Sequence, residues 1–265
     1  MGSATREALA GSKAALAALG TTADLATAED LFAAARAIGD SAQLRAVISD
    51  PSADAAGKSA LISRIFASQL SKPAVSLLET VAAQRWSNQD DVLAGIEELG
   101  IRAVAASARK DTSIESELFA FGAAVTSNAE LELALGSKLG DPSAKTAVLE
   151  KLLSGKAADG TLAIVRQLVS QPRGRRLRVA LQRSAAIVAD QAGQAIATVT
   201  SATAIAPAQL ERLASGLSKR YGANLTVNQV IDPAVIGGLR VQIGDDVIDG
   251  TIASRLGDVK LKLAG

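Results

Sequence analysis

The chain has 265 residues, a formal net charge of +1 and no Cys or His. The missing residue types exclude Cys–His and Ser–His catalysis, His- or Cys-ligated zinc and disulfides within the chain. The small net charge gives no global attraction to nucleic acid. No apolar run approaches the ~20 residues that span a bilayer, and the first residues lack the pattern of a secretory signal. We therefore expect a protein of the cytosol without direct membrane insertion, with about two domains for this length.

Helical periodicity dominates the chain up to residue 192. Strong helix formers are frequent, and apolar residues recur three or four positions apart. Trp86 lies at a break between two such segments and is expected in the core. Short loops between helices of this kind predict a compact antiparallel bundle. The apolar stripes include Ala60, Leu61, Ile65 and Phe66, then Val75, Leu78 and Val81, then Val92, Ile96, Leu99 and Ala103.

Comparison of the chain with itself shows a period of 87 residues. Leu31-Phe32-Ala33 corresponds to Leu118-Phe119-Ala120, and Gln84 corresponds to Gln171. Matched apolar positions over several helices, together with matched turn residues, favour a duplication over chance. We therefore expect a first helical bundle over residues 1–106 and a bundle-like duplicate over residues 107–192.

The two copies differ in charge and in one arginine-rich loop. Residues 1–106 have 9 basic and 12 acidic side chains, a balance of −3, whereas residues 113–192 have 10 and 8, a balance of +2. The loop lacks the interleaved aromatic residues of nucleic-acid binders, so we expect it to be solvated or to contact an acidic partner. Adjacent carboxylates such as Glu97-Glu98 diverge by about 100° on a helix and are expected to be solvated rather than catalytic. The arginines of the loop are Arg173, Arg175, Arg176 and Arg178.

From residue 193 the pattern changes to strands. The segment from Ala195 to Ala202 is rich in β-formers, and Pro207 suits the first turn of a helix that reaches Tyr221. Leu225-Thr226-Val227 then begins a second strand. These residues predict a strand, a helix and a further strand at the start of a small α/β tail.

The last residues predict a hairpin and a final helix. Val241 and Ile243 alternate with polar neighbours, and Gly244-Asp245-Asp246 is turn chemistry before Val247-Ile248 returns antiparallel. Asp249 is placed to cap a helix from Thr251 to Leu263. The predicted fold class is therefore mainly α, with two helical bundles and a small C-terminal domain of order β-α-β-β-β-α.

The glycines of the tail belong to a recognisable signature. A phosphate cradle is one interpretation, but a P-loop would end in Lys-Ser or Lys-Thr at a helix start, which this run lacks. The run instead resembles the C-terminal signature of the delta subunit of F-type ATP synthases, called the oligomycin-sensitivity conferral protein in mitochondria. Thr251 replaces the serine of the family pattern. The matching residues are Asp232, Ile236, Gly237, Gly238, Val241, Ile243, Gly244, Asp245, Val247, Asp249, Gly250, Ile252 and Leu256.

The resemblance implies a non-catalytic stator subunit without a cofactor. In this family the subunit joins the catalytic head to the peripheral stalk and resists rotor torque. A groove between the first and fifth helices of the N-terminal bundle receives N-terminal helices of the alpha subunits. The C-terminal domain, here 193–265, binds the b-type stalk. The groove maps onto Ala8, Leu9, Leu16, Leu77, Val81 and Gln84.

The same resemblance sets further expectations. It implies a monomer when isolated, one copy per complex and a peripheral location at the cytoplasmic face of the cell membrane. The duplicated segment resembles the long form known among actinobacteria, in which a second bundle-like segment precedes the C-terminal domain. Mainly structural roles, in turns and bulges, are expected for Asp232, Gly237, Gly238, Gly244, Asp249 and Gly250.

Two other functions stay open at this point. A helical adaptor outside the synthase would explain the bundles but not the C-terminal signature. An enzyme that uses carboxylates alone is compatible with the composition, but no constellation of residues supports it.

Overall fold

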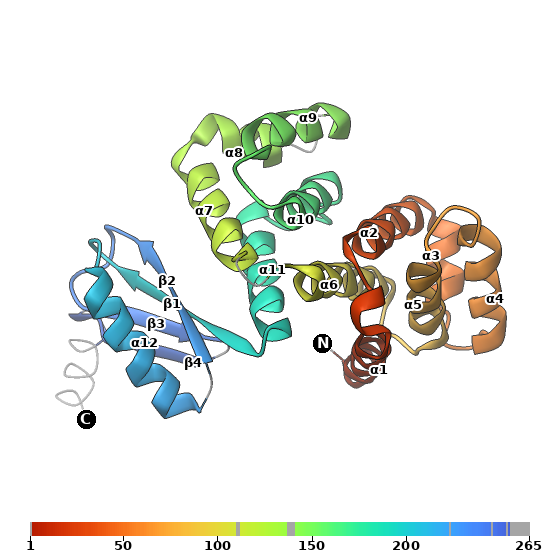
Figure 1. The fold of residues 1–265 in the computed structure, drawn as a ribbon, viewed down its shortest axis with the longest axis horizontal. Coiled ribbons are helices and arrows are strands. Elements are labelled where there is room, and N and C mark those ends of the chain that lie inside the picture. Colours follow the sequence, from red (N-terminus) through yellow and green to blue (C-terminus); the bar gives the residue numbers. More distant parts are fainter. Residues whose placement is uncertain are drawn as a thin grey trace, which may run out of the picture. The chain divides into compact units, whose positions relative to one another are not determined.

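The computed structural model describes residues 2–109, 112–136, 141–222, 224–244, 246–252 and 254. The chain divides into two compact units, Met1–Val188 and Ala189–Gly265 (Figure 1). The first unit is helical and the second is built on a four-stranded sheet. The predicted fold class, mainly α with a small α/β tail, is confirmed. The expected three-part division into 1–106, 107–192 and 193–265 stays a prediction about independent folding.

Eleven α-helices form or begin in the helical unit as described. Several of them start where a side chain accepts a hydrogen bond from the first turn, as at Asp24, Ser41, Asp54 and Asn88. Their bounds are α1 Ser3–Leu19, α2 Leu25–Asp40, α3 Ala42–Ser49, α4 Ala55–Phe66, α5 Lys72–Ala83, α6 Gln89–Ser107, α7 Ile114–Ser127, α8 Ala129–Gly136, α9 Pro142–Leu153, α10 Asp159–Ser170 and α11 Leu177–Gln191.

The predicted period of 87 residues appears in the helix bounds. Helices α8, α9 and α10 begin at 129, 142 and 159, each 87 residues after α3, α4 and α5 at 42, 55 and 72. Helix α7 ends at 127, which is 87 residues after the end of α2 at 40. The second set of helices is therefore a structural copy of the first.

Helix α6 belongs to both copies. Shifting α1, 3–19, by the period of 87 gives 90–106, which lies within α6 at 89–107. Helix α6 is thus the last helix of the first repeat and the first helix of the second. It packs against α1, α2, α3, α5 and α10, and every residue from Gly95 to Val104 is buried.

Glycines of α6 make room for aromatic side chains of the first repeat. A Cβ on Gly95 would overlap the ring of Trp86, and one on Gly100 would overlap the ring of Phe32. Trp86 is buried, as predicted, and its Nε1 donates to the carbonyl oxygen of Val81 at 2.8 Å. The absence of side chains at two points of α6 therefore lets α2 and the α5–α6 loop approach it closely.

The C-terminal unit is a mixed sheet with one described helix. Strand β1, Gln194–Ser201, pairs parallel with β2, Asn224–Ile231, and α12, Pro207–Tyr221, joins them. Strand β3, Leu239–Ile243, lies antiparallel on the other side of β1, and β4, Asp246–Asp249, forms the edge. The core contains Ala197, Val199, Leu217 and Val241. The predicted final helix, 251–263, lies mostly outside the described residues, as does Asp245.

Within the part of the chain that the structure describes, no single helix is long and apolar enough to cross a bilayer. Helices α7 and α8 pass a test of length and composition only when taken together, and they are bent by 109° at their junction.

The packing of Trp86 on Gly95 leads to a stability prediction. We expect Gly95→Ala to lower the free energy of unfolding by about 1–3 kcal/mol, because the added methyl group must displace the indole ring. Gly57→Ala in α4 is the matched control, since its Cβ would meet only Asp54 Oδ2 at 3.7 Å. Urea unfolding should show Gly57→Ala unchanged or slightly more stable; equal losses in the two variants would contradict the packing argument.

Candidate partner-binding surfaces

Five of the six predicted groove residues are buried. Ala8, Leu9, Leu16, Leu77 and Val81 are all buried in the core, with exposed fractions of 9% or less. As placed, they belong to the core and are not accessible to a partner. Gln84 is the exception among the six, because it is half-buried.

Gln84 lies between the two helices at the surface. A Cβ on Gly11 of α1 would be 3.0 Å from Gln84 Nε2, so the amide lies across the backbone of α1. Among the described residues its side chain makes no hydrogen bond. Arg6, Lys13 and Thr80 are likewise exposed or half-buried on α1 and α5. We call these four residues, Arg6, Lys13, Thr80 and Gln84, the α1–α5 seat.

The equivalent positions of the second repeat are covered by α2. The period of 87 relates Arg6, Lys13, Thr80 and Gln84 to Leu93, Gly100, Gln167 and Gln171. Leu93 and Gly100 of α6 face Gly39 and Phe32 of α2. The first three counterparts are buried, whereas the seat residues of the first repeat are not.

Side chains of α10 bind α2 through a chain of hydrogen bonds. Arg36 Nη1 donates to Gln167 Oε1 at 2.6 Å, and Gln167 Nε2 donates to Gln171 Oε1 at 2.9 Å. Gln171 Nε2 then donates to the backbone oxygen of Ala35 at 2.9 Å. Sequence reasoning missed this network, although the match of Gln84 with Gln171 pointed to it.

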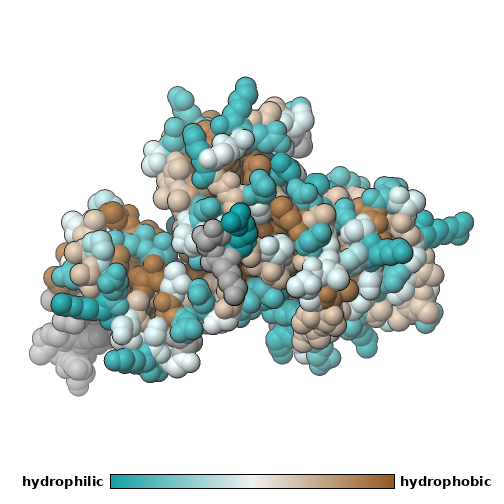
Figure 2. Space-filling model, in the orientation of Figure 1, coloured by the Kyte–Doolittle hydropathy of each residue, from teal (hydrophilic) through white to brown (hydrophobic). Residues whose placement is uncertain are grey.

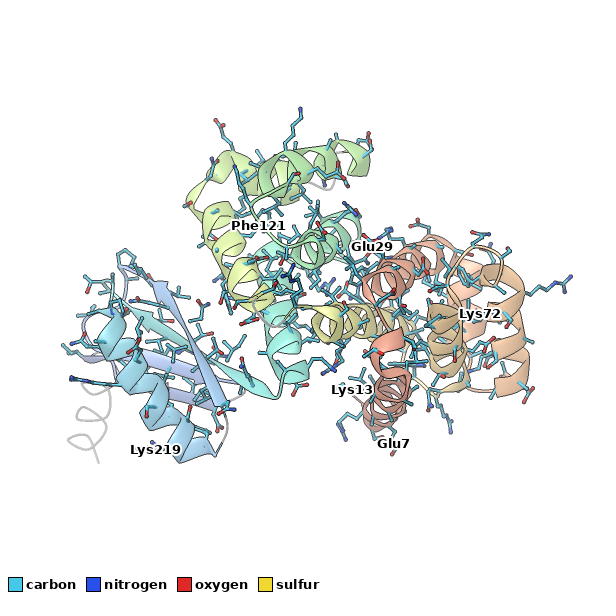
Figure 3. The ribbon with its side chains drawn as sticks, in the orientation of Figure 1. Glu7, Lys13, Glu29, Lys72, Phe121 and Lys219 are labelled. Carbon is cyan, nitrogen blue, oxygen red and sulfur yellow. The ribbon has the colours of Figure 1, made fainter. Side chains whose placement is uncertain are left out.

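Charge pairing adds to the contact between α2 and α10. Arg166 of α10 lies 3.5 Å from Glu29, which Figure 3 places on the side of α2 that faces α10. Burial, followed by the charge of Arg166, lowers the pKa of Arg36. Helix α2 of the first repeat is therefore held against the second repeat by polar contacts as well as by its apolar face.

Two arginines of the basic loop are ion-paired inside the chain. Arg175 binds both carboxylate oxygens of Glu97, at 2.6 and 2.8 Å, and Arg173 binds one of them at 2.8 Å. The Glu97 side chain is 5% exposed, and those of Arg173 and Arg175 are 16% and 20% exposed. The expectation of a solvated or intermolecular loop is therefore wrong for these two arginines, because the fold brings a buried carboxylate beside them. Arg176 and Arg178 are exposed.

The backbone of the loop is left-handed at two successive residues. Arg173 is the one non-glycine residue with positive φ, 49°, in the part of the chain that the structure describes, and Gly174 follows with φ 74°. Burial lowers the pKa of Arg173, and the adjacent Glu97 carboxylate opposes that shift. The arginine keeps its charge at neutral pH because the ordinary pKa of a guanidinium lies far above neutrality.

Glu98 is also buried, and it faces different partners from Glu97. Its Oε1 lies 2.9 Å from Arg102 Nη2 and 3.3 Å from Lys13 Nζ, and its Oε2 lies 3.9 Å from Arg183 Nη2. The expectation that Glu97 and Glu98 are solvated is wrong, because α6 is enclosed by both repeats. Their divergence on the helix, which was predicted, explains why they bind different cations.

The signature glycines of the tail shape its backbone. Gly237 and Gly238 have φ values of 62° and 78°, and Gly244 has φ 57° in the β3–β4 turn. A Cβ on Gly237 would lie 2.6 Å from Ile252 Cδ1, and a Cβ on Gly238 would overlap the backbone oxygen of Gly250. These glycines are therefore needed for backbone conformation and close approach.

The two acidic residues of the signature organise turns. Asp232 Oδ1 accepts from Ala234 N at 2.9 Å, and Asp249 Oδ1 accepts from Thr251 N at 2.9 Å and Thr251 Oγ1 at 2.7 Å. The Thr251 side-chain hydrogen bond is the main cause that lowers the pKa of Asp249. Thr251 Oγ1 in turn accepts from Ser254 N at 3.2 Å. The prediction that Asp249 caps the start of the helix is therefore wrong. Thr251 Oγ1 is the capping atom, and the Asp249 carboxylate orients it.

The second repeat has several exposed apolar side chains. Leu133 of α8 is 73% exposed, and Val148 and Leu152 of α9 are also exposed. The face of the helical unit in view in Figure 2 mixes hydrophilic and hydrophobic residues. Among the described residues, no group of three or more His, Cys, Asp or Glu side chains is placed to hold a metal ion.

The fold and these surfaces define a helical-repeat protein with a small α/β tail. Residues 101–263 match the family model of the ATP synthase delta (OSCP) subunit. The chain is 63% identical over 265 residues to the ATP synthase subunit delta of Leifsonia xyli subsp. xyli, and all of both chains is covered. It is 37% identical over 271 residues to that of Streptomyces griseus subsp. griseus, again with all of both chains covered. The chain belongs to the ATP synthase delta (OSCP) family.

A solved structure also resembles part of the chain. It is a chain of the Toxoplasma gondii mitochondrial ATP synthase hexamer, with a TM-score of 0.43 and 19% sequence identity. The alignment covers 64% of this chain and 96% of that chain.

The pairing of Glu97 leads to a second stability prediction. Glu97→Gln should lower the free energy of unfolding by about 2–4 kcal/mol, since it leaves two partly buried guanidinium groups without a counter-charge. Glu29→Gln is the control, because the Glu29 side chain is 50% exposed and surface pairs contribute about 0–1 kcal/mol. Urea unfolding at neutral pH measures both; a Glu97→Gln loss no larger than that of the control would contradict the buried pairing.

The tail glycines lead to a third prediction. Ala at position 238 or 244 should cost about 1–2 kcal/mol for the left-handed backbone conformation. Gly238→Ala should cost more, because its Cβ also overlaps backbone atoms, whereas the Cβ of Gly244→Ala would enter open space. Gly238→Val should be at least as harmful. Thermal unfolding of the full chain measures the stability of each variant. Equal melting temperatures for Gly238→Ala and Gly244→Ala would contradict the predicted overlap of the Gly238→Ala methyl group with backbone atoms.

Proposed function

We propose that the chain joins the catalytic head of an F-type ATP synthase to its peripheral stalk and bears the torque between them. Membership in the delta (OSCP) family makes it a stator component of that synthase. The proposal includes a non-catalytic role, one copy per complex, a monomeric state when isolated and a location at the cytoplasmic face of the membrane. Its partners are the N-terminal helices of the alpha subunits and the b-type stalk.

The alpha contact is assigned to the first repeat. The observation that carries this assignment is the difference in burial between the α1–α5 seat and its counterpart in the second repeat. Helix α2 covers the counterpart, as its hydrogen bonds with Gln167 and Gln171 indicate. An amphipathic partner helix therefore finds the accessible seat on α1 and α5, in the mode of a helix bound in a groove.

The C-terminal unit is assigned to the stalk. Its signature glycines and turns hold β3 and β4 against β1, and its sheet core is separate from that of the helical unit. The second repeat serves as a spacer or as an extra stalk contact. Because Arg173 and Arg175 are paired within the chain, that contact would use Arg176, Arg178 and the exposed Leu133, Val148 and Leu152.

The division of labour predicts the effect of a truncation. A chain ending at residue 192 should lose binding to the purified b-type subunit while it still binds a synthetic peptide of the alpha N-terminus. Surface plasmon resonance measures both interactions, and circular dichroism checks that the truncated chain remains helical. Stalk binding with unchanged affinity in a folded truncation would contradict the assignment of the stalk to the C-terminal unit.

A further inference from the structure

The contact of α2 with the second repeat indicates which kind of helix binds the first repeat. Both repeats have the same helices in the same order, and each has a glutamine at the end of the helix that forms one wall of the groove, Gln84 or Gln171. In the second repeat the groove is filled by a helix of the same chain. That helix is an internal example of what the corresponding groove binds.

The key contact in this example is made to the helix backbone. Gln171 Nε2 donates to the carbonyl oxygen of Ala35, and a Cβ on Gly39, one turn later, would overlap that nitrogen. In an α-helix the side chain of residue i+4 leans back over the preceding turn and covers the carbonyl region of residue i. An outside donor therefore reaches a helix carbonyl only where the residue one turn later is very small.

Gln84 is prepared for the same contact. Its amide lies over Gly11 of α1, it is half-buried, and its side chain has no hydrogen bond among the described residues. Thr80, which replaces Gln167, donates its hydroxyl proton to the Ser76 carbonyl oxygen at 3.0 Å, so it leaves Gln84 without the side-chain partner that Gln171 has. A half-buried amide without a hydrogen bond therefore favours binding of a partner whose carbonyl oxygen accepts from it.

We propose that Gln84 binds the backbone of the partner helix in the α1–α5 seat by donating to a main-chain carbonyl. The partner helix must then carry a very small residue one turn after the bound carbonyl, as α2 carries Gly39 one turn after Ala35. Arg6 and Lys13 stand where the second repeat has Leu93 and Gly100, so the charged side chains of the α1–α5 seat replace an apolar one and a glycine. The inference rests on the proposed function, in which this partner is the alpha N-terminal helix.

The test uses the full chain and a synthetic peptide of the alpha-subunit N-terminus. Gln84→Ala should weaken binding about fivefold to tenfold, and Gln84→Glu at least as much, because an ionised carboxylate has no proton to donate. Gln43→Glu, on the exposed surface of α3, is the matched control and should bind as the unmodified chain does. Fluorescence anisotropy gives the affinities, and NMR should show a shift of the Gln84 side-chain amide protons.

A second set of peptides tests the partner's side of the contact. Replacing by leucine the small residue one turn after the bound carbonyl should abolish the Gln84 effect, so that Gln84→Ala and the unmodified chain bind this peptide equally weakly. Peptide binding at Lys13 and Thr80 with no loss in either Gln84 variant would overturn the inference and leave the proposed function in place. Absence of peptide binding, or shifts confined to α6 and α10, would overturn both.

Discussion

The enclosure of α6 is the constraint on which the helical unit depends. Because this helix closes the first repeat and opens the second, it has neighbours from both, and its middle from Gly95 to Val104 is buried. No face of the helix is exposed to solvent in this stretch. Its glycines admit aromatic rings from the first repeat, and each charged residue that it carries in that stretch must find a counter-charge.

The ion pairs follow from this enclosure. Glu97 and Glu98 are taken out of water by packing and not by their local sequence, and the chain satisfies them with Arg173, Arg175 and Arg102. The cost of desolvating two charges limits the stability that such pairs contribute, but the loss of one partner is expensive. The α10–α11 loop is therefore held on α6 in one arrangement. A subunit that transmits torque benefits from contacts that are costly to break one at a time.

The sequence predicted the fold class, the duplication and the tail because these depend on local periodicity and turn chemistry. The period of 87 and the roles of Gly237, Gly238 and Gly244 needed no knowledge of long-range contacts. The interpretations that failed concern burial. The local sequence around Glu97 and Glu98 is typical of an exposed helix turn, and that around Arg173 and Arg175 is typical of a solvated loop. Their burial results from the packing of α6 between two repeats, which the local sequence does not show. The capping role of Thr251 was missed because Asp249 has the same local chemistry.

The contact between repeats is heterologous, since α2 of one repeat packs on α6 and α10 of the next, and no symmetry axis closes it. In such an array each added repeat brings one new seat between its first and fifth helices. That seat is covered, because the helix of the preceding repeat that corresponds to α2 packs on it. Duplication therefore lengthens the helical unit, and among the described residues the accessible seat stays at α1 and α5. The half-buried Phe119 and Gly122, which correspond to Phe32 and Ala35, mark the opposite end of the described repeats. If the α1–α5 seat binds the partner helix as proposed, a subunit lengthened in this way keeps one such seat among the described residues.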